Sequence, residues 1–488
     1  MLAVSAAVVG VLVLLCARRR GAVVLCVLGL TAALWLVGQS FSQPATPVRF
    51  DEHGPTLLHL DRLAAYMMVT LFVAALAVSL FAHDYFARDA AASDEFYLLL
   101  LLATFGGAVL AAATHFVSLF LGLEILSVSL YAMIAYRADR PIGIEGAIKY
   151  LVLTSVVSAV LLFGMALLYA RWGTMELSPL SAAMASAGLA SEGLASAGLA
   201  MLLVGVGFKL AWAPLHLWAG DVYHAAPAPT TAFVATVSKG AAFALLLRWV
   251  TRIHYAQHEG VALALLLVAG VSMCVGNLLA LRADRLKRLL AYSSIAQGGY
   301  LLTAVLAGRE WYDREGGALA VQAAGFYLPV YLAALLGAMG VVSVLARDAS
   351  DGADDADHFS RYRGLFFRRP VLACVLTLML LSLAGLPLTA GFVGKFLIVL
   401  ASVRTGLWTL GALLVLNSAV SLYYSLRVAA MMCTHGVDVS PVPPSPSNTI
   451  RVPAMIVLVG ITFMVLALGI YPNPLIEFIY QTVTYELP

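Results

Sequence analysis

Apolar runs of about twenty residues recur along almost the whole chain and are separated by short polar connections. A run of that length crosses the ~30 Å hydrocarbon layer of a bilayer as an α-helix. The pattern therefore predicts an all-α polytopic membrane protein with about fourteen transmembrane helices. The expected spans are residues 1–17, 21–38, 62–83, 95–113, 115–136, 142–171, 198–219, 229–250, 260–281, 288–307, 318–345, 370–401, 407–431 and 452–472.

Composition agrees with this class and excludes several others. Of the 488 residues, 62% are hydrophobic and 11% are charged, whereas soluble domains carry roughly 25% charged residues. The net charge of +3 does not indicate nucleic-acid binding. The five cysteines lie far apart, mostly in apolar runs, and form no CxxC or CxxCH pattern, so neither a zinc knuckle nor covalent haem attachment is indicated. No Walker loop, dinucleotide fingerprint, catalytic triad or metal-ligand cluster occurs, and we expect no cofactor bound by this chain itself.

The basic residues predict the orientation. Arg18, Arg19 and Arg20 follow the first apolar run, whereas a signal peptide carries its charges before the apolar core, so this run is expected to be a retained anchor. With the N-terminus outside, most basic residues fall in inner loops, as the positive-inside rule requires, and both termini lie outside. The inner group is Arg18–Arg20, Arg137, Arg140, Arg282, Arg285, Lys287, Arg288, Arg361, Arg363, Arg368 and Arg369.

Lysine usage is the most informative feature of the composition. The chain has 24 arginines but five lysines, and all lysines except Lys287 fall within or near apolar runs. The other four are Lys149, Lys209, Lys239 and Lys395. A charge in hydrocarbon costs several kcal/mol, so an intramembrane ionisable residue indicates a functional site. Arginine cannot lose its proton in a protein, whereas a buried lysine can. The pattern therefore predicts proton movement.

Two of the spans that carry these lysines are interrupted. Pro214 follows Lys209 closely, and Pro387 precedes Lys395 among several glycines. Proline breaks or kinks a helix, and a broken helix at membrane depth needs protein or water to satisfy its backbone. One such span in each half of the chain is typical of an inverted-repeat transporter. We predict an N-terminal three-helix segment (1–94), two inverted five-helix repeats (95–250 and 260–431), each a proton half-channel, and a C-terminal helix (452–488).

Other polar residues leave alternatives open. Glu124 lies in the middle of its span and is either part of a proton path or a carboxylate that only holds the bundle together. Lys149 lies only a turn or two into its span and is either a functional residue or one that snorkels to the inner surface. His216 and His224 are either relays to the inner side or simple helix caps. His115 and His216 show no paired pattern typical of haem ligation.

Three further features receive a structural interpretation. The acidic run at 348–357 matches no EF-hand spacing, and a solvated inner loop is favoured over a cation site. Residues 185–199 repeat Ala-Ser-x-Gly-Leu, which predicts either an outer loop or the start of the next helix. Tyr150, Tyr292 and Tyr300 are interpreted as packing or interface aromatics. The acidic residues are Asp348, Asp351, Asp354, Asp355 and Asp357.

Several motifs resemble a known family. They are FLGLEILSVSLYAM around Glu124, GFKLAWAPLHLW around Lys209, DVYHAAPAP leading to Lys239, and LSLAGLPLTAGFVGKF ending near Lys395. Together they resemble the proton-pumping, antiporter-like membrane subunits of respiratory complex I, the NADH:quinone oxidoreductase. KRLLAYSSIAQGGYLL and YRGLFFRRP are most similar to the bacterial N subunit. The resemblance extends over about residues 95–472. Ala219-Gly220 and His224 depart from the usual family pattern.

The resemblance implies a fourteen-helix fold in the bacterial inner membrane, with both termini periplasmic. It implies that Glu124 and Lys209 form a charged pair and that Lys239 and Lys395 continue a polar line across the membrane plane. Lys149 and His216 are further candidates for proton translocation by their positions in the sequence. The implied partners are an M-type antiporter-like subunit, the small K-, J- and A-type subunits and the lipid bilayer. NADH, FMN, iron–sulfur clusters and quinone would then belong to the rest of the complex.

Two other functions remain open at this stage. One is a subunit of a multi-subunit cation/proton antiporter or membrane-bound hydrogenase with the same fold. The other, from a different class, is a quinone- or haem-binding redox anchor.

Overall fold

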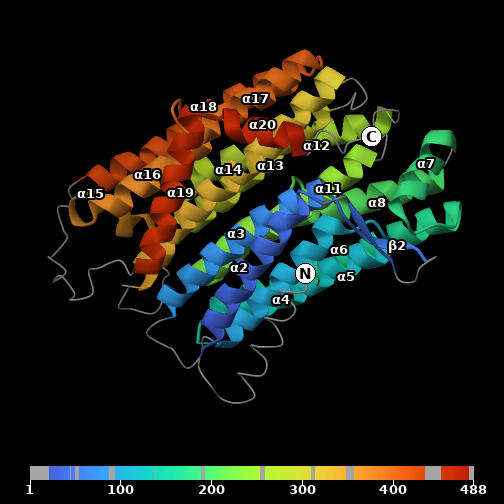
Figure 1. Ribbon diagram of the computed structural model, residues 1–488. Helices are drawn as coiled ribbons and strands as arrows, with labels where there is room; N and C mark the ends of the chain where they lie inside the picture. Colours follow the sequence, from blue (N-terminus) through green and yellow to red (C-terminus); the bar gives the residue numbers. More distant parts are fainter. Residues whose placement is uncertain are drawn as a thin grey trace.

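The computed structural model describes residues 21–43, 45–49, 54–86, 94–137, 139–187, 193–252, 259–308, 314–347, 357–434 and 452–482. Long helices lie side by side in one bundle, with the first half of the chain on one side and the second half on the other (Figure 1). The predicted first span, residues 1–17, lies outside the described residues.

The first half contains most of the secondary-structure types in the chain. Its elements are α2 (Ala22–Ser40), β1 (Thr46–Arg49), β2 (Thr56–Leu60), α3 (Arg62–Tyr85), α4 (Asp94–Ala112), α5 (Phe116–Ile134), α6 (Pro141–Trp172), α7 (Leu177–Ala187), α8 (Gly193–Lys209), α9 (Leu217–Ala225), α10 (Ala228–Phe233), a π-helical turn η3 (Val234–Ser238) and α11 (Lys239–Arg252).

The second half is helical throughout its described residues. Its elements are α12 (Glu259–Arg282), α13 (Leu286–Ala307), α14 (Arg314–Arg347), a 3-10 turn η5 (Phe359–Tyr362), α15 (Leu365–Arg368), α16 (Pro370–Ala384), α17 (Ala390–Arg404), α18 (Trp408–Cys433), α19 (Val452–Ile470) and α20 (Asn473–Thr482).

The prediction of a polytopic all-α membrane fold is confirmed. Within the described residues, eleven helices are long and apolar enough to cross a membrane, and α8 and α16 are shorter apolar helices. The boundaries agree with the predicted spans to within a few residues in most cases. Both predicted helix breaks are present, because α8 and α9 replace the single span at 198–219, and α16 and α17 replace that at 370–401. The division into two inverted repeats stays a prediction.

The centre of the bundle is formed by α10, η3, α11 and α14. The span from Ala228 to Val250 is completely buried. It packs on α3 and α4 from the first half and on α14 from the second. Helix α14 in turn contacts α3, α13, α16, α17 and α19. A helix that is apolar on every face belongs in such an interior position, and here the central helices join the two halves.

A two-stranded hairpin covers one end of the first half and was not predicted. Strands β1 and β2 pair antiparallel, with Thr46 opposite Leu60. Ser118 at the start of α5 donates a hydrogen bond to the Leu57 carbonyl at 2.6 Å, and Thr114 donates to the Thr56 carbonyl at 3.0 Å. These side chains satisfy strand carbonyls that a two-stranded ribbon leaves open, and they hold the hairpin against the bundle.

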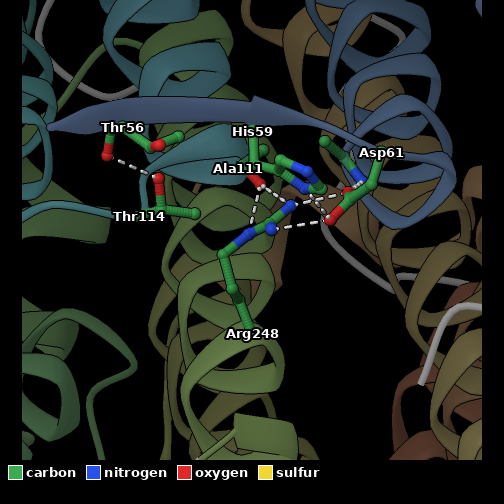
Figure 2. Close-up of polar contacts among 7 residues, drawn as sticks. Thr56, His59, Asp61, Ala111, Thr114 and Arg248 are labelled. Atoms are coloured by element: carbon green, nitrogen blue, oxygen red, sulfur yellow. Dashed lines mark hydrogen bonds and ion pairs between the residues drawn. The ribbon is translucent and has the colours of Figure 1, made fainter. Parts of the chain in front are cut away.

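A buried ion pair joins the same end of the bundle to α11 (Figure 2). The Arg248 guanidinium donates to both carboxylate oxygens of Asp61 at 2.7 Å, and also to the Ala111 carbonyl at 3.2 and 3.1 Å. His59 lies 3.1 Å from the same carboxylate. Asp61 also caps α3 by accepting the Ala64 N–H at 2.7 Å. The pair therefore connects the hairpin, α3, α4 and α11.

The structure corrects two sequence interpretations at the other end of the bundle. Lys287, assigned to a loop, is completely buried, and its amine donates to the Ala226 carbonyl at 2.9 Å. Asp357, assigned to a solvated acidic loop, is 1% exposed. Its carboxylate accepts the Lys287 backbone N–H at 2.7 Å and lies 2.6 Å from His224. The free first-turn N–H groups of α13 explain this burial, because they need an acceptor. Asp348, Asp351, Asp354 and Asp355 lie outside the described residues.

Candidate functional site

Lys209 ends α8 at the first helix break and is 5% exposed. Its amine donates to the Ser127 hydroxyl of α5 at 2.6 Å and to the Tyr150 hydroxyl of α6 at 3.2 Å. The amine also lies 5.3 Å from the centre of the Tyr150 ring. Hydroxyl oxygens and an aromatic face accept a cation without fixing it as a carboxylate would. The site can therefore hold the amine in either charge state.

Neighbouring side chains satisfy the backbone at this break. The Ala213 N–H donates to the Ser272 hydroxyl of α12 at 3.0 Å, and the Trp218 indole donates to the Phe208 carbonyl at 2.9 Å. A broken helix in a membrane requires partners of this kind. The break is therefore stabilised by the surrounding helices, and it places Lys209 in the interior of the bundle.

Glu124 lies on the outer face of α5, close to Lys209 but not paired with it. It shares one helical stripe with the exposed residues Val117, Leu121 and Val128, and its carboxylate accepts a hydrogen bond from Ser158 of α6 at 2.6 Å. Ser127, the partner of Lys209, follows Glu124 by one helical turn. Within the described residues, the two charges form no ion pair within 4.0 Å, so the charged pair implied by the family resemblance is not closed in this conformation.

Lys239 lies at the centre of the molecule, directly after the π-helical turn, and is 4% exposed. Its amine donates to the Ser294 hydroxyl of α13 at 2.6 Å and lies 5.6 Å from the centre of the Tyr223 ring. A small cavity of about 10 Å³ is bounded by Lys239, Ser294 and Trp212. That volume is at the lower limit for one water molecule. The cavity reaches from the first helix break to Lys239.

Lys395 lies in α17 beside the second break and is also 4% exposed. Its amine donates a hydrogen bond to the carbonyl of Ala384, the last residue of α16, at 2.9 Å. The amine also lies 4.8 Å from the centre of the Tyr300 ring. Gly385 has a φ of +87°, and a Cβ there would meet the Lys395 side chain at 2.9 Å. The left-handed conformation and the close approach both favour glycine. The break thus supplies the amine with a free carbonyl.

The packing of α17 against α16 yields a stability prediction. A Cβ on Gly391 would lie 1.8 Å from the Ser382 carbonyl oxygen, so Gly391→Ala forces the two half-helices apart and should cost about 2 kcal/mol or more. Thermal unfolding of the purified protein would show this as a lowered midpoint and reduced yield. Gly460→Ala is the matched control, because no atom lies within 4 Å of a Cβ there. Equal midpoints for both variants would contradict the close packing.

Side chains of two helices connect the three lysine sites. From α9, the Trp218 ring lies 4.9 Å from Tyr150 and 6.5 Å from Tyr223, which are the aromatic partners of Lys209 and Lys239. On α13, Ser294 contacts Lys239 and Tyr300 contacts Lys395. Ser294 and Tyr300 are six residues apart, which corresponds to about 9 Å along the helix axis. The three buried amines are therefore linked through α9 and α13 into one region.

A polar junction supports the Lys395 end of this region. Asn277 of α12 donates to the Tyr300 hydroxyl at 3.1 Å and to the Asn417 side-chain oxygen at 3.2 Å. It also accepts a hydrogen bond from the Tyr424 hydroxyl at 3.1 Å. Gln297 donates to the Leu383 carbonyl at 3.0 Å and accepts from Tyr327. These contacts fix the position of the Tyr300 ring under the amine.

The remaining predicted site residues lie away from the buried amines. Lys149 is 48% exposed and pairs with Glu145 at 2.8 Å and Asp221 at 3.2 Å. His216 is half-buried at the N-terminus of α9. His224 contacts Asp357, as described above. His115 caps α5 by accepting the Val117 N–H at 3.2 Å.

Sequence reasoning missed the hydroxyl and amide partners of the lysines. Tyr150 and Tyr300, interpreted as packing residues, also contact lysine amines. Ser294 and Gln297 were visible as polar residues within an apolar span at helical spacing, and that signal could have marked them. Asn277 and Tyr424 gave a similar signal in α12 and α18.

The chain is similar to proteins of a known family. Residues 113–421, more than half of the chain, match the family described as NADH:quinone oxidoreductase/Mrp antiporter, TM. A chain of respiratory complex I from Thermus thermophilus, solved with bound aureothin, is 30% identical over 97% of this chain and 98% of that chain, with a TM-score of 0.77.

Two further solved structures share the fold. A chain of the membrane-bound sulfane sulfur reductase, an archaeal respiratory membrane complex, is 23% identical over 99% of this chain and 96% of that chain, with a TM-score of 0.85. A chain of the Mrp complex from Dietzia sp. DQ12-45-1b is 19% identical over 100% and 96%, also with a TM-score of 0.85. The resemblance noted in the sequence is thereby confirmed at the level of the family: the chain belongs to the antiporter-like membrane subunits of the NADH:quinone oxidoreductase and Mrp antiporter family.

Proposed function

We propose that this chain is the proton-translocating N-type membrane subunit of an NADH:quinone oxidoreductase. The observation that supports this best is the burial of three lysines, each 4–5% exposed, at two helix breaks and a π-helical turn. Their amines contact hydroxyls, a carbonyl and aromatic faces, and within the described residues none is fixed in an ion pair. A buried lysine without an ion partner is costly in free energy, and such a residue is expected where its charge must change during turnover.

The proposed mechanism uses the distance between charges. Burial disfavours a charged amine, and a nearby carboxylate favours it. If Glu124 approaches Lys209, the lysine holds its proton. If it withdraws towards Ser158, the proton can pass through water to Lys239 and then to Lys395. Within this scheme Ser127 and Ser294 orient the amines, and Lys149 and His216 are candidates for proton access at the surface.

Glu124 also supports the proposal of a partner subunit. A half-buried carboxylate on an otherwise apolar, exposed stripe is costly when it faces lipid but suits a protein interface. We propose that this stripe faces the M-type antiporter-like subunit and that the small K-, J- and A-type subunits contact other faces. NADH, FMN, iron–sulfur clusters and quinone would be bound by the rest of the complex. The proposed location is the bacterial inner membrane, with both termini periplasmic.

The second candidate function is a subunit of a cation/proton antiporter or of a related respiratory complex. The similar folds of the Mrp and sulfane sulfur reductase chains keep it open. The higher identity to the complex I chain favours the first proposal. A quinone- or haem-binding anchor receives no support from the site, which is occupied by tightly packed side chains.

An affinity tag on this chain separates the candidates. Purification from the native membrane should yield a complex that oxidises NADH, reduces quinone and acidifies the lumen of proteoliposomes in the same preparation. An uncoupler should abolish the acidification but not the electron transfer. A complex that exchanges sodium for protons and lacks NADH oxidation would instead support the antiporter.

A further inference from the structure

A cavity of about 190 Å³ lies at the end of the bundle opposite the hairpin, where α12 ends and α13 begins. It is lined by Ala280, Leu289, Phe359, Arg363, Tyr424, Arg427, Val428 and Met431. The volume is more than ten times the ~10–15 Å³ that a single water needs. Apart from the two arginines and the Tyr424 hydroxyl, its walls are apolar. The lysine sites described above do not include it.

The two arginines are available to bind an anion. The Arg427 guanidinium donates one bond, at 3.2 Å, to the Leu281 carbonyl near the end of α12. That contact holds the group in place and leaves most of its five N–H donors free. Within the part of the chain that the structure describes, neither Arg363 nor Arg427 forms an ion pair. Positive charge also gathers nearby: Arg368 lies close to Arg369 and Arg361, and burial together with these two guanidinium groups lowers the pKa of Arg368.

The depth of the cavity identifies the kind of anion. Helix α18 begins at Trp408, which is 64% exposed, and Arg427 follows after nineteen residues, or about 29 Å of helix. The hydrocarbon layer is ~30 Å thick. Tyr423, one turn before Arg427, is 65% exposed, and exposed Trp and Tyr mark the two membrane interfaces. Arg427 therefore lies at the level of the lipid phosphates.

We propose that this cavity is a binding site for the phosphodiester head group of an anionic phospholipid, held by Arg363 and Arg427. Guanidinium forks match phosphate oxygens in geometry and charge. The apolar walls formed by Leu289, Val428 and Met431 accommodate the glycerol and the first acyl carbons. Basic pockets between transmembrane helices at this depth suit such head groups.

Photocrosslinking in the assembled complex tests the site without requiring turnover. A photoactivatable phosphatidylglycerol should label peptides that contain Phe359–Arg363 and Tyr424–Met431, as identified by mass spectrometry. The Arg363→Gln/Arg427→Gln double variant should lose this labelling by about 25-fold, because each basic residue near the surface contributes about fivefold. Arg282→Gln is the matched control, because it removes the same charge from the same end of α12 without lining the cavity, and should leave the labelling unchanged.

The competitors distinguish the possible sources of the anion. Unlabelled phosphatidylglycerol should displace the probe, whereas phosphatidylcholine and inorganic phosphate should not at the same concentration. Displacement by inorganic phosphate would overturn the lipid assignment in favour of a free anion. Equal labelling by a phosphatidylcholine probe, or unchanged labelling in the double variant, would show that the arginines do not bind the anionic head group, and would overturn the proposal.

Discussion

Lys239→Arg is expected to abolish coupled proton translocation although it keeps the positive charge. Arginine cannot release its proton in a protein, whereas the proposed relay requires Lys239 to alternate between its charge states. The loss of a positioned proton-transfer group typically lowers a rate by about 10²–10⁴-fold. Acidification of proteoliposomes driven by NADH would measure the effect, and electron transfer in the presence of an uncoupler would show that the redox part of the complex is intact.

Lys287→Arg is the matched control for this experiment. Lys287 is as deeply buried as Lys239, and its amine donates to the Ala226 carbonyl just after α9. Arginine can donate to the same carbonyl, so this variant should keep most of the pumping. Pumping at the normal rate by a well-assembled Lys239→Arg complex would remove Lys239 from the proton path.

Arg248→Ala should be the most destabilising single substitution considered. It removes Arg248 from a buried ion pair in which the side chains of Arg248 and Asp61 are 1% and 8% exposed, and it leaves the Asp61 carboxylate buried without its guanidinium partner. Breaking a buried pair in this way costs about 3–5 kcal/mol. Thermal unfolding of the purified complex, followed by the signal of a tag on this chain, should show a clearly lowered midpoint and less assembled complex.

The pair also determines the pH range of this contribution. Burial raises the pKa of Asp61, but hydrogen bonds from His59 and Arg248 and the charge of Arg248 overcome it, and the pKa lies well below its usual range. A carboxyl group with a lowered pKa stabilises the fold at every pH above its unfolded value and loses this contribution only on acidification through the folded value. The contribution of the pair to the stability of the wild type should therefore stay constant from neutral pH down to about pH 5. The Asp61→Asn/Arg248→Met double variant, which leaves no buried charge, should be less destabilised than Arg248→Ala. The opposite order would mean that the Asp61 carboxylate left without its guanidinium is not what destabilises Arg248→Ala.

The sequence predicted the spans, both helix breaks and the buried lysines because each depends on local information. Hydrophobic run length predicts a span directly, and Pro214 and Pro387 interrupt the helical hydrogen bonding of their spans. The lysines Lys209, Lys239 and Lys395 were recognisable because charge is rare in such runs. The structure places all three in the protein interior rather than at the membrane surface.

What could not be predicted depends on contacts between distant residues. The sequence alone does not explain why Arg248 is buried, because its partner Asp61 lies 187 residues away. Lys287 and Asp357 looked like loop charges, because the sequence does not show that the end of α9 lies beside the start of α13. Tyr150 and Tyr300 are typical packing residues in composition, and their contacts with lysine amines arise from helix packing.

The most direct test of the account is to locate water around the lysines in a cryo-electron microscopy map of the assembled complex. The account predicts one ordered water within hydrogen-bonding distance of the Lys239 amine, in the cavity beside Trp212 and Ser294, and further waters elsewhere that connect it to Lys209 and Lys395. A dry interior, in which each amine is separated from the next by packed apolar side chains in every state of the enzyme, would contradict proton transfer along this line.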